Sequence, residues 1–470
     1  MLQVYSMWDL TEIAKQAMEE RGFLPEFPPR VISEVGRWKA AALPRSPYKD
    51  LREIPWVSID NVTSKDLDQL TYASGNRIFV AISDVDALVS KGSEADRYAL
   101  TNTTSVYTPT ITFPMLPEPL SHHLTSLVEH EDRAALVTEI ELDDDGKFLS
   151  WDIYYAWVKN HAKLAYPRVG EALQNGSADP QLQLQDKLAQ RIEAFRLRQG
   201  ALNFDTIELE TEVVENQVVG IKEAAFNRAH SLIENFMIAS NIATVRFLRA
   251  RGLPTLRRAV REPKRWGRIV DLAKDYHFSL PDEPDAKALQ TFLTERKAKD
   301  PDAFADLSLA IIKLVGRGEY IASFPGKKAP GHFDLAVLDY AHTTAPNRRY
   351  PDLVNQRLIK STLFQTPLPY KEQELIDIAA HCSQKEDDAT KVERRMLKSA
   401  AAVVLSSQIG REFPAIVTGI NEHGTWVRLD TPAIEGKLVR GEPSLDVGDK
   451  IRVKLLHTDV VKGFIDFERI

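Results

Sequence analysis

Residues 56–69 read W-V-S-I-D-N-V-T-S-K-D-L-D-Q and join an apolar stretch to three carboxylates. The run up to Ile59 is typical of a buried strand. Asp60 ends that strand, and a short loop can bring it back to Asp66 and Asp68. Those two residues are two apart, a spacing that places their side chains on one face of an extended chain. This stretch predicts a sheet that ends at a charged site.

Three carboxylates that lie close together repel one another, and their pKa values rise unless a cation neutralises them. Hard oxygen ligands suit Mg²⁺, which leaves positions for water and substrate phosphates and can assist phosphodiester cleavage. A calcium loop needs Gly at position six and Glu at position twelve. Counting from Asp60 gives Lys65 and Thr71, and counting from Asp66 gives Thr71 and Arg77, so both registers fail. A solvated acidic turn stays open as the alternative.

Strand patterns continue beyond this stretch and then give way to helical ones. Period-two and β-branched runs predict strands at 77–83, 134–142 and 151–158. From 183 to 405 the apolar spacing is mainly helical, which predicts one large α+β domain, at about 50–405, with strands early and helices late.

The last 60 residues or so carry a different pattern. Five short strands between 412 and 467, separated by glycine-marked turns, predict a small all-β barrel of the OB type at 410–470. Trp426 and Phe464 could stack on bases there, or could be barrel core. Four cations of the barrel could contact phosphate: Arg428, Lys450, Arg452 and Lys454.

The first 45 residues predict a small helical region. Residues 9–21 show an amphipathic helix with Asp9 as N-cap, and Pro28-Pro29 open a second helix. The pair fits either a helix-turn-helix unit or a helical lead-in packed on the next domain. Residues 43–55, which are polar and marked by proline, predict a linker.

Composition excludes several classes of protein. No apolar run reaches the roughly 20 residues that span a bilayer, and the N-terminus lacks a signal-peptide pattern. The single cysteine, Cys382, excludes an internal disulfide framework. We therefore expect a cytoplasmic protein with no membrane partner. The net charge of −7 leaves room for a local basic surface, and residues 256–268, with six basic side chains, are either that surface or a solvated face.

Four blocks of the sequence resemble the ribonuclease II and ribonuclease R family. They are residues 58–69, 80–89, 104–121 and 332–359, and they occur in the family's order. The C-terminal barrel is similar to an S1-type RNA-binding domain. The resemblance implies a processive 3′→5′ exoribonuclease that hydrolyses RNA with Mg²⁺ and releases nucleoside 5′-monophosphates. We expect it to act on single-stranded 3′ ends as a monomer.

The resemblance also implies roles for individual residues. Asp60, Asp66 and Asp68 take the metal-site positions, and Arg348 matches the arginine that contacts the scissile phosphate. The residues expected to contact RNA are Tyr107, Tyr166, Phe204, Glu234, Glu393, Arg349 and Trp426.

The sequence departs from the family pattern at two acidic positions. Gln69 stands where the family usually has a fourth aspartate, and Asn235 replaces the second of two glutamates. An amide brings no charge, so metal affinity and rate are in question. Asp84 is the nearest candidate to compensate.

Many family members carry two cold-shock barrels ahead of the catalytic block, which begins here near residue 50. The sequence therefore suggests an open approach that tolerates structured RNA, with the N-terminal helices touching duplex. Two rival readings are an RNA-binding protein with a degenerate, inactive nuclease site and a DNA-binding regulator built on the N-terminal helices.

Overall fold

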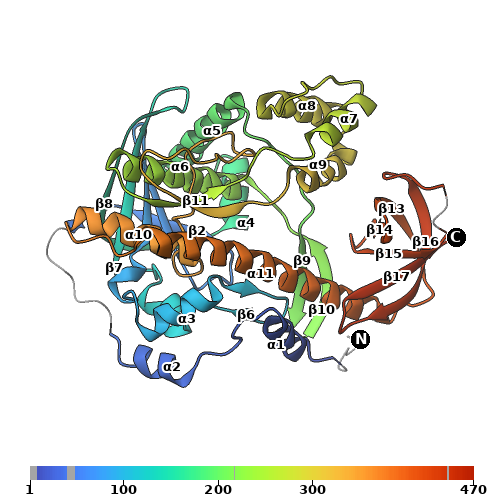
Figure 1. Cartoon of the computed structure of the whole chain (residues 1–470), viewed down its shortest axis with the longest axis horizontal. Coiled ribbons are helices and arrows are strands. Elements are labelled where there is room, and N and C mark those ends of the chain that lie inside the picture. The colour runs from blue at the N-terminus through green and yellow to red at the C-terminus, as the bar shows by residue number, and fades with distance from the viewer. Residues whose placement is uncertain (1–7, 40–47, 216, 442–443) are drawn as a thin grey trace.

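The structure is a computed structural model, and it describes residues 8–39, 48–215, 217–441 and 444–470. Figure 1 shows a body of sheet and helices, and a barrel that stands apart from it at the C-terminal end of one long helix. The mixed helix and strand content and the C-terminal barrel confirm the predicted fold class.

The central sheet of the body has six strands in the order β1-β8-β2-β3-β4-β7. A further pairing between β7 and β8 closes a ring of β8, β2, β3, β4 and β7, and β1 pairs with β8 outside it. The strands are β1 (Lys49–Asp50), β2 (Trp56–Asp60), β3 (Gln69–Ser74), β4 (Arg77–Ser83), β7 (Asp132–Leu142) and β8 (Phe148–Ala165).

Apolar residues cover both faces of this sheet. One face carries a buried cluster that includes Trp56, Leu70 and Val137. The other face packs Ile59 and Val80 against three helices, α4 (Tyr166–Gln174), α5 (Pro180–Gln199) and α6 (Arg228–Ala250). Burial on both sides explains why the strands read as near-continuous apolar runs in the sequence.

Strand predictions at 77–83, 134–142 and 151–158 are confirmed by β4, β7 and β8. The predicted linker is wrong in part, because Lys49–Asp50 forms β1 and pairs in parallel with β8. Residues 43–47 of that linker lie outside the described residues.

The region predicted as helical contains four strands that the pattern missed. They are β9 (Leu209–Val214), β10 (Gln217–Glu223), β11 (Thr255–Ala259) and β12 (Glu319–Ser323). Its remaining helices are α7 (Trp266–Asp275), α8 (Ala286–Lys299), α9 (Pro301–Val315), α10 (Tyr350–Leu363) and α11 (Glu372–Ser406). Short elements between β4 and β7 are η1 (Val85–Ala87), α3 (Glu94–Asn102), β5 (Val106–Tyr107), β6 (Thr112–Phe113) and η2 (Pro119–Leu124).

The C-terminal strands form a closed barrel in the order β13-β14-β15-β17-β16. The strands are β13 (Glu412–Asn421), β14 (Gly424–Leu429), β15 (Glu435–Arg440), β16 (Lys450–Asp459) and β17 (Phe464–Arg469). The predicted five-stranded barrel is confirmed.

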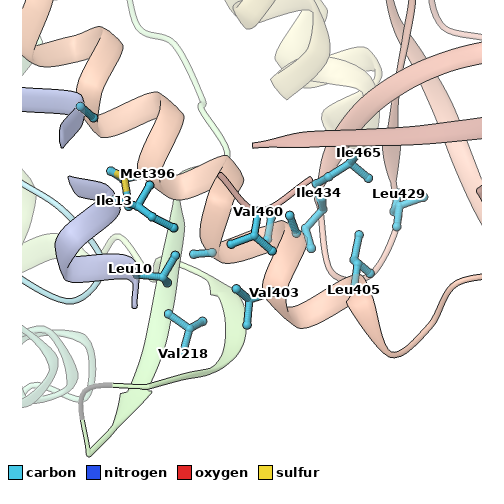
Figure 2. Packing of buried hydrophobic residues seen from close by; sticks show 14 of the residues in the cluster. Leu10, Ile13, Val218, Met396, Val403, Leu405, Leu429, Ile434, Val460 and Ile465 are labelled. Carbon is cyan, nitrogen blue, oxygen red and sulfur yellow. The ribbon is translucent and has the colours of Figure 1, made fainter. Parts of the chain in front are cut away.

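Helix α11 connects the body to the barrel through one continuous apolar cluster. Its last turns carry Met396, Val403 and Leu405, which pack in the same cluster as Val460 and Ile465 of the barrel (Figure 2). With 35 residues, α11 is about 50 Å long. The shared core fixes the barrel to the helix end.

The N-terminal helices α1 (Leu10–Glu20) and α2 (Pro29–Val35) pack on the body. The predicted N-cap is confirmed, because Asp9 accepts hydrogen bonds from the backbone N–H groups of Thr11 and Glu12. Leu10 and Ile13 lie beside Met396 of α11 (Figure 2), whereas α2 packs in the cluster around α3. This separate packing favours the helical lead-in over a helix-turn-helix unit.

Candidate active site

Asp60 occupies the last position of β2, where the strand pairs with Ala165 of β8. Gln69, the first residue of β3, donates its amide Nε2–H to Asp60 Oδ1 at 3.0 Å. The second oxygen, Asp60 Oδ2, is buried and has no hydrogen-bond partner within the described residues. Gln69 therefore orients one oxygen of Asp60 and leaves the other for a ligand.

Asp68 is the most deeply placed carboxylate of the cluster, with 2 % of its surface exposed. Its Oδ1 accepts the backbone N–H of Asn347 at 3.1 Å, and its Oδ2 lies 3.5 Å from Nε of Arg348. Like Asp60 Oδ2, Asp68 Oδ2 is buried and accepts no hydrogen bond within the part of the chain described. The sheet and the 345–349 loop thus meet at this side chain.

Asp66 lies at the more open side of the cluster, in a loop rather than in an extended strand. The hydroxyl of Tyr107 donates to Asp66 Oδ2 at 3.4 Å. Glu393 of α11 holds Tyr107 in place, because its Oε1 accepts the Tyr107 backbone N–H at 2.9 Å. Glu393, which the resemblance assigns to RNA contact, thus binds the backbone of a residue that lines the site.

Burial dominates the electrostatics of the two inner carboxylates. It raises the pKa of Asp60 to about 6, although the Gln69 hydrogen bond lowers it. Burial raises the pKa of Asp68 to about 7, against the lowering effect of Arg348. The charge of Asp66 raises both pKa values further. A bound cation would reduce the repulsion and the burial cost of these charged carboxylates.

Two buried carboxylate oxygens without a hydrogen bond among the described residues, and a third nearby carboxylate, are ligands of the kind that suits a small hard cation such as Mg²⁺. Across the described ranges, no three His, Cys, Asp or Glu side chains are placed close enough together to hold a metal ion by themselves. Mg²⁺ is commonly held by one or two carboxylates, with water and substrate phosphates supplying the rest. Asp60 and Asp68 would hold the ion, with Asp66 beside them.

A cation bound here is expected to stabilise the protein in a pH-dependent way. Below pH 6 the raised pKa values keep Asp60 and Asp68 partly protonated, so Mg²⁺ must compete with protons for these carboxylates. At pH 8 both carboxylates are mainly charged and can bind Mg²⁺ without that competition. We expect 10 mM MgCl₂ to raise the melting temperature by about 2–5 °C at pH 8 and not at pH 5. Thermal unfolding against NaCl of equal ionic strength measures this, and an equal shift at both pH values would contradict it.

The two neighbouring arginines of the 345–349 loop have different surroundings. The Arg348 side chain is 44 % exposed and approaches Asp68, so its guanidinium can reach a substrate phosphate. Arg349 points inward, where its Nη2 donates to Asp352 Oδ1 at 2.8 Å. Asp352, at 0 % side-chain exposure, uses the charge of Arg349 within the protein, while the RNA contact of Arg349 stays a prediction.

Asn347 holds the 345–349 loop against the segment that contains Thr125, a role that the sequence did not predict. Its Oδ1 accepts the hydroxyl of Thr125 at 2.5 Å, and its Nδ2 donates to the Thr125 carbonyl at 3.2 Å. Its own N–H binds Asp68. Only its place directly before Arg348 signals this role in the sequence.

Asp84 does not compensate for Gln69. Its carboxylate accepts from Lys360 at 2.9 and 3.1 Å and from the Tyr48 hydroxyl at 2.6 Å. On the same helix, α10, Arg357 is buried and pairs with Asp86 at 2.7 Å. These buried pairs tie α10 to the end of β4 and so support the Arg348 loop at the N-terminus of α10.

Tyr166 follows Ala165, the partner of Asp60 in the sheet, so it lies beside the carboxylates. Its ring stacks on His230 with centroids 3.9 Å apart. Phe204 is half-buried and packs against the apolar cluster of α7, α8 and α9. The structure thus gives Tyr166 a place at the site and Phe204 a core contact.

The other predicted RNA contacts lie farther from the carboxylates. Glu234 is exposed on α6, and the neighbouring Asn235 is buried, where it accepts a hydrogen bond from Arg196 at 2.6 Å. Trp426 lines a cavity of about 560 Å³ between the barrel and the body. Arg428, expected to contact phosphate, pairs with Asp306 of α9 at 2.7 Å and tethers the barrel.

Half of the basic stretch 256–268 has a structural role. Arg257 pairs with Asp339, Arg258 with Glu386, and Arg261 with Glu319. Lys264, Arg265 and Arg268 are exposed. Only this second half remains a candidate surface for a polyanion.

Comparison with known proteins places this site in a family. A model described as the RNB domain matches residues 48–365, and one described as the RNase II-type exonuclease C-terminal S1 domain matches residues 411–470. The chain is 31 % identical to ribonuclease R of Thermotoga maritima, over 97 % of the chain and 69 % of that protein. It is 30 % identical to ribonuclease R of Escherichia coli, over 90 % of the chain and 57 % of that protein.

Solved structures agree on the fold. Mycoplasma genitalium RNase R in complex with double-stranded RNA matches with a TM-score of 0.88 and 25 % identity, over 98 % of the chain and 83 % of that one. Yeast Ssd1, described as a pseudonuclease, matches with a TM-score of 0.73 and 18 % identity, over 92 % and 56 % of the two chains. That second likeness concerns the fold alone.

Among the described residues, no helix is long and apolar enough to cross a membrane. The domain that carries the carboxylate cluster and the C-terminal barrel occur together in one chain, and each matches a domain model of the same group of exonucleases. The chain therefore belongs to the RNB family of 3′→5′ exoribonucleases, which includes ribonuclease R.

Proposed function

We propose that this protein is a Mg²⁺-dependent, processive 3′→5′ exoribonuclease that hydrolyses RNA to nucleoside 5′-monophosphates. The observation that carries the proposal is the pair of buried carboxylate oxygens, on Asp60 and Asp68, that have no hydrogen-bond partner among the residues described and lie near Arg348. Family membership supports the direction and the product.

The residues of the site have different roles in phosphodiester cleavage. The Arg348 guanidinium binds the scissile phosphate through its N–H donors and stabilises the negative charge that develops on the phosphoryl oxygens. Asn347 and Gln69 hold Asp68 and Asp60 in place. A bound Mg²⁺ would supply activation of water and charge neutralisation at the leaving oxygen.

Retention of the strand between cleavage steps depends on contacts that do not read sequence. Tyr107 and Tyr166 stand around the carboxylates, and an aromatic face is worth about 1–3 kcal/mol per stacked base. Trp426 in the cavity beside the barrel gives a second, distant contact. Contacts with the strand both at the carboxylates and at the barrel favour a processive enzyme that acts on single-stranded 3′ ends.

We extend the proposal to structured RNA. The support is the likeness to the Mycoplasma genitalium RNase R, which was solved with double-stranded RNA. A gel assay on a duplex with a short 3′ overhang tests this, and complete arrest at the junction would refute it. The cytoplasm and a monomeric state stay predictions, with the buried free thiol of Cys382 in keeping with a reducing compartment.

The test of the main activity is a time course on 5′-labelled single-stranded RNA with Mg²⁺, beside a reaction with EDTA. A metal-dependent fall to short 5′ fragments without a ladder supports a processive 3′→5′ enzyme. RNA that stays intact but is shifted on a gel would instead support the second candidate function.

That second candidate is an RNA-binding protein with an inactive site. The observation in its favour is Gln69, which contributes no charge to the cluster and occupies Asp60 Oδ1. The fold by itself does not decide between the two, since the pseudonuclease Ssd1 shares it.

Gln69→Asp tests whether Gln69 limits metal binding in an active enzyme. A carboxylate at this position adds a ligand charge and removes the donor to Asp60, so we expect the Mg²⁺ concentration for half-maximal activity to fall about tenfold. The metal-free protein should lose about 1–3 kcal/mol of unfolding free energy. Gln69→Leu, which removes the donor without adding charge, is the matched control and should not lower the Mg²⁺ requirement. An unchanged requirement in Gln69→Asp would place Gln69 outside the metal site.

A further inference from the structure

An aromatic stack extends outward from the carboxylate cluster. The ring of Tyr166 lies nearly parallel to that of His230, with an interplanar angle of 15° and centroids 3.9 Å apart. Phe226 lies beside this pair without stacking on it: its centroid is 5.1 Å from that of His230, its ring is tilted by 52°, and it is 61 % exposed. Tyr166 lies some 60 positions before Phe226 and His230 in the sequence, so its ring meets theirs only in the folded protein.

The position of His230 is fixed by the first turn of α6. Asn227 caps this helix, and its backbone N–H donates to His230 Nδ1 at 3.2 Å in a capping box. The Asn227 amide Nδ2–H also donates to the Tyr166 carbonyl at 2.9 Å. One residue therefore holds both members of the stack.

The close approach of α4 and α6 makes this arrangement tight. A Cβ atom at Gly170 of α4 would lie 2.4 Å from the Asn227 side chain, so the contact requires glycine. The hydrogen bonds of Asn227 fix the Tyr166 backbone relative to the first turn of α6. The ring of Tyr166 is then oriented by its stacking contact with His230.

Tyr166 is the member of the stack nearest the chemistry. It follows the residue that pairs with Asp60, and the charges of Asp60 and Arg348 both act on its hydroxyl. A ring at this place meets the base of a nucleotide whose phosphate lies at the carboxylates. A preorganised ring binds that base without a further loss of side-chain entropy.

We propose that His230 is a positioning residue that holds the ring of Tyr166 for stacking on a nucleobase beside the scissile phosphate. This rests on the proposed function, since the base belongs to the RNA substrate. The flat face of His230 sets the plane of Tyr166. Losing it should weaken RNA binding about five- to tenfold and leave the bond-breaking step nearly unchanged.

The test uses an RNA with 2-aminopurine as its 3′-terminal base, whose fluorescence is quenched when it stacks. Binding is measured in an Asp68→Asn background, so that the RNA stays intact. His230→Leu, which fills the space without a flat ring, should reduce the quench and raise the Kd about five- to tenfold. His230→Phe should restore both. In the catalytically intact chain, His230→Leu should raise KM by a similar factor with kcat changed less than twofold.

The outcomes distinguish the inference from the proposed function. A folded His230→Leu variant with an unchanged quench and Kd would overturn the positioning role, as would a His230→Phe variant no better than His230→Leu. If the unmodified chain binds and quenches the probe in this pattern but never degrades RNA, the proposed activity fails and the positioning role stands. If His230→Leu does not fold, His230→Phe against His230→Tyr and His230→Gln repeats the comparison of flat rings with a non-aromatic side chain.

Discussion

Asp68→Asn is expected to abolish RNA hydrolysis and, in the metal-free protein at pH 8, to increase stability. Activity should fall on the order of 10³-fold, because the amide cannot neutralise a cation at the centre of the site. The Asn347 N–H still finds an acceptor in the new side chain, so the 345–349 loop keeps its hydrogen bond. Function and stability should therefore move in opposite directions.

The gain in stability follows from the raised pKa of Asp68. The folded-state pKa of about 7 lies above the ordinary value of 3.8, so the folded state binds the proton more tightly than the unfolded state. The stability of the metal-free protein then falls as pH rises from about 4 to about 7. At pH 8 the buried charge of Asp68 lowers the unfolding free energy by its full amount, on the order of 1–4 kcal/mol. Asp68→Asn removes this charge and its cost.

Thermal unfolding in EDTA measures this difference. The melting temperature of Asp68→Asn should exceed that of the unmodified chain at pH 8, and the gap should be clearly smaller at pH 5 and close near pH 4. Asp144→Asn, at a side chain that is 90 % exposed, is a control that should change neither activity nor stability. A gap of equal size at both pH values would show that the gain does not come from titration of Asp68.

Two substitutions at adjacent residues should have different effects. We expect Arg348→Ala to reduce catalysis and Arg349→Ala to destabilise the fold. Arg348 is 44 % exposed and its loss should reduce kcat on the order of 10³-fold while the melting temperature stays within a few degrees. Arg349 is the charge partner of Asp352, whose side chain is fully buried, so its loss should destabilise the fold by about 3–5 kcal/mol.

The measurement pairs single-turnover kinetics with chemical denaturation for both variants. Arg348→Lys is the conservative check: it keeps the charge but loses the paired donors, so most of the kcat defect should remain. Should Arg349→Ala fold normally and lose cleavage, while Arg348→Ala keeps it, the two assignments would have to be exchanged.

The strands of the sheet and barrel were readable from sequence because their signals are local. Alternation over 77–83 and glycine turns after 412 need no distant partner to be recognised. Strands β11 and β12 were missed, since each is short and lies among helices. They exist because residues 255–259 pair with 319–323, some 60 positions away, and no local pattern reports such a pairing.

The sequence by itself determined which residue types gather at the site and the family to which they belong. Asp60, Asp66, Asp68 and Arg348 stand in blocks whose order and spacing are specific. Only the tertiary structure decided the partner of each charge. Gln69 donates a hydrogen bond to Asp60, Lys360 pairs with Asp84, and Arg349 pairs with Asp352. The reason is physical. A buried charge must be paired or it is costly, and the partner that satisfies it comes from whichever segment the fold brings within hydrogen-bond distance, which composition and spacing do not encode.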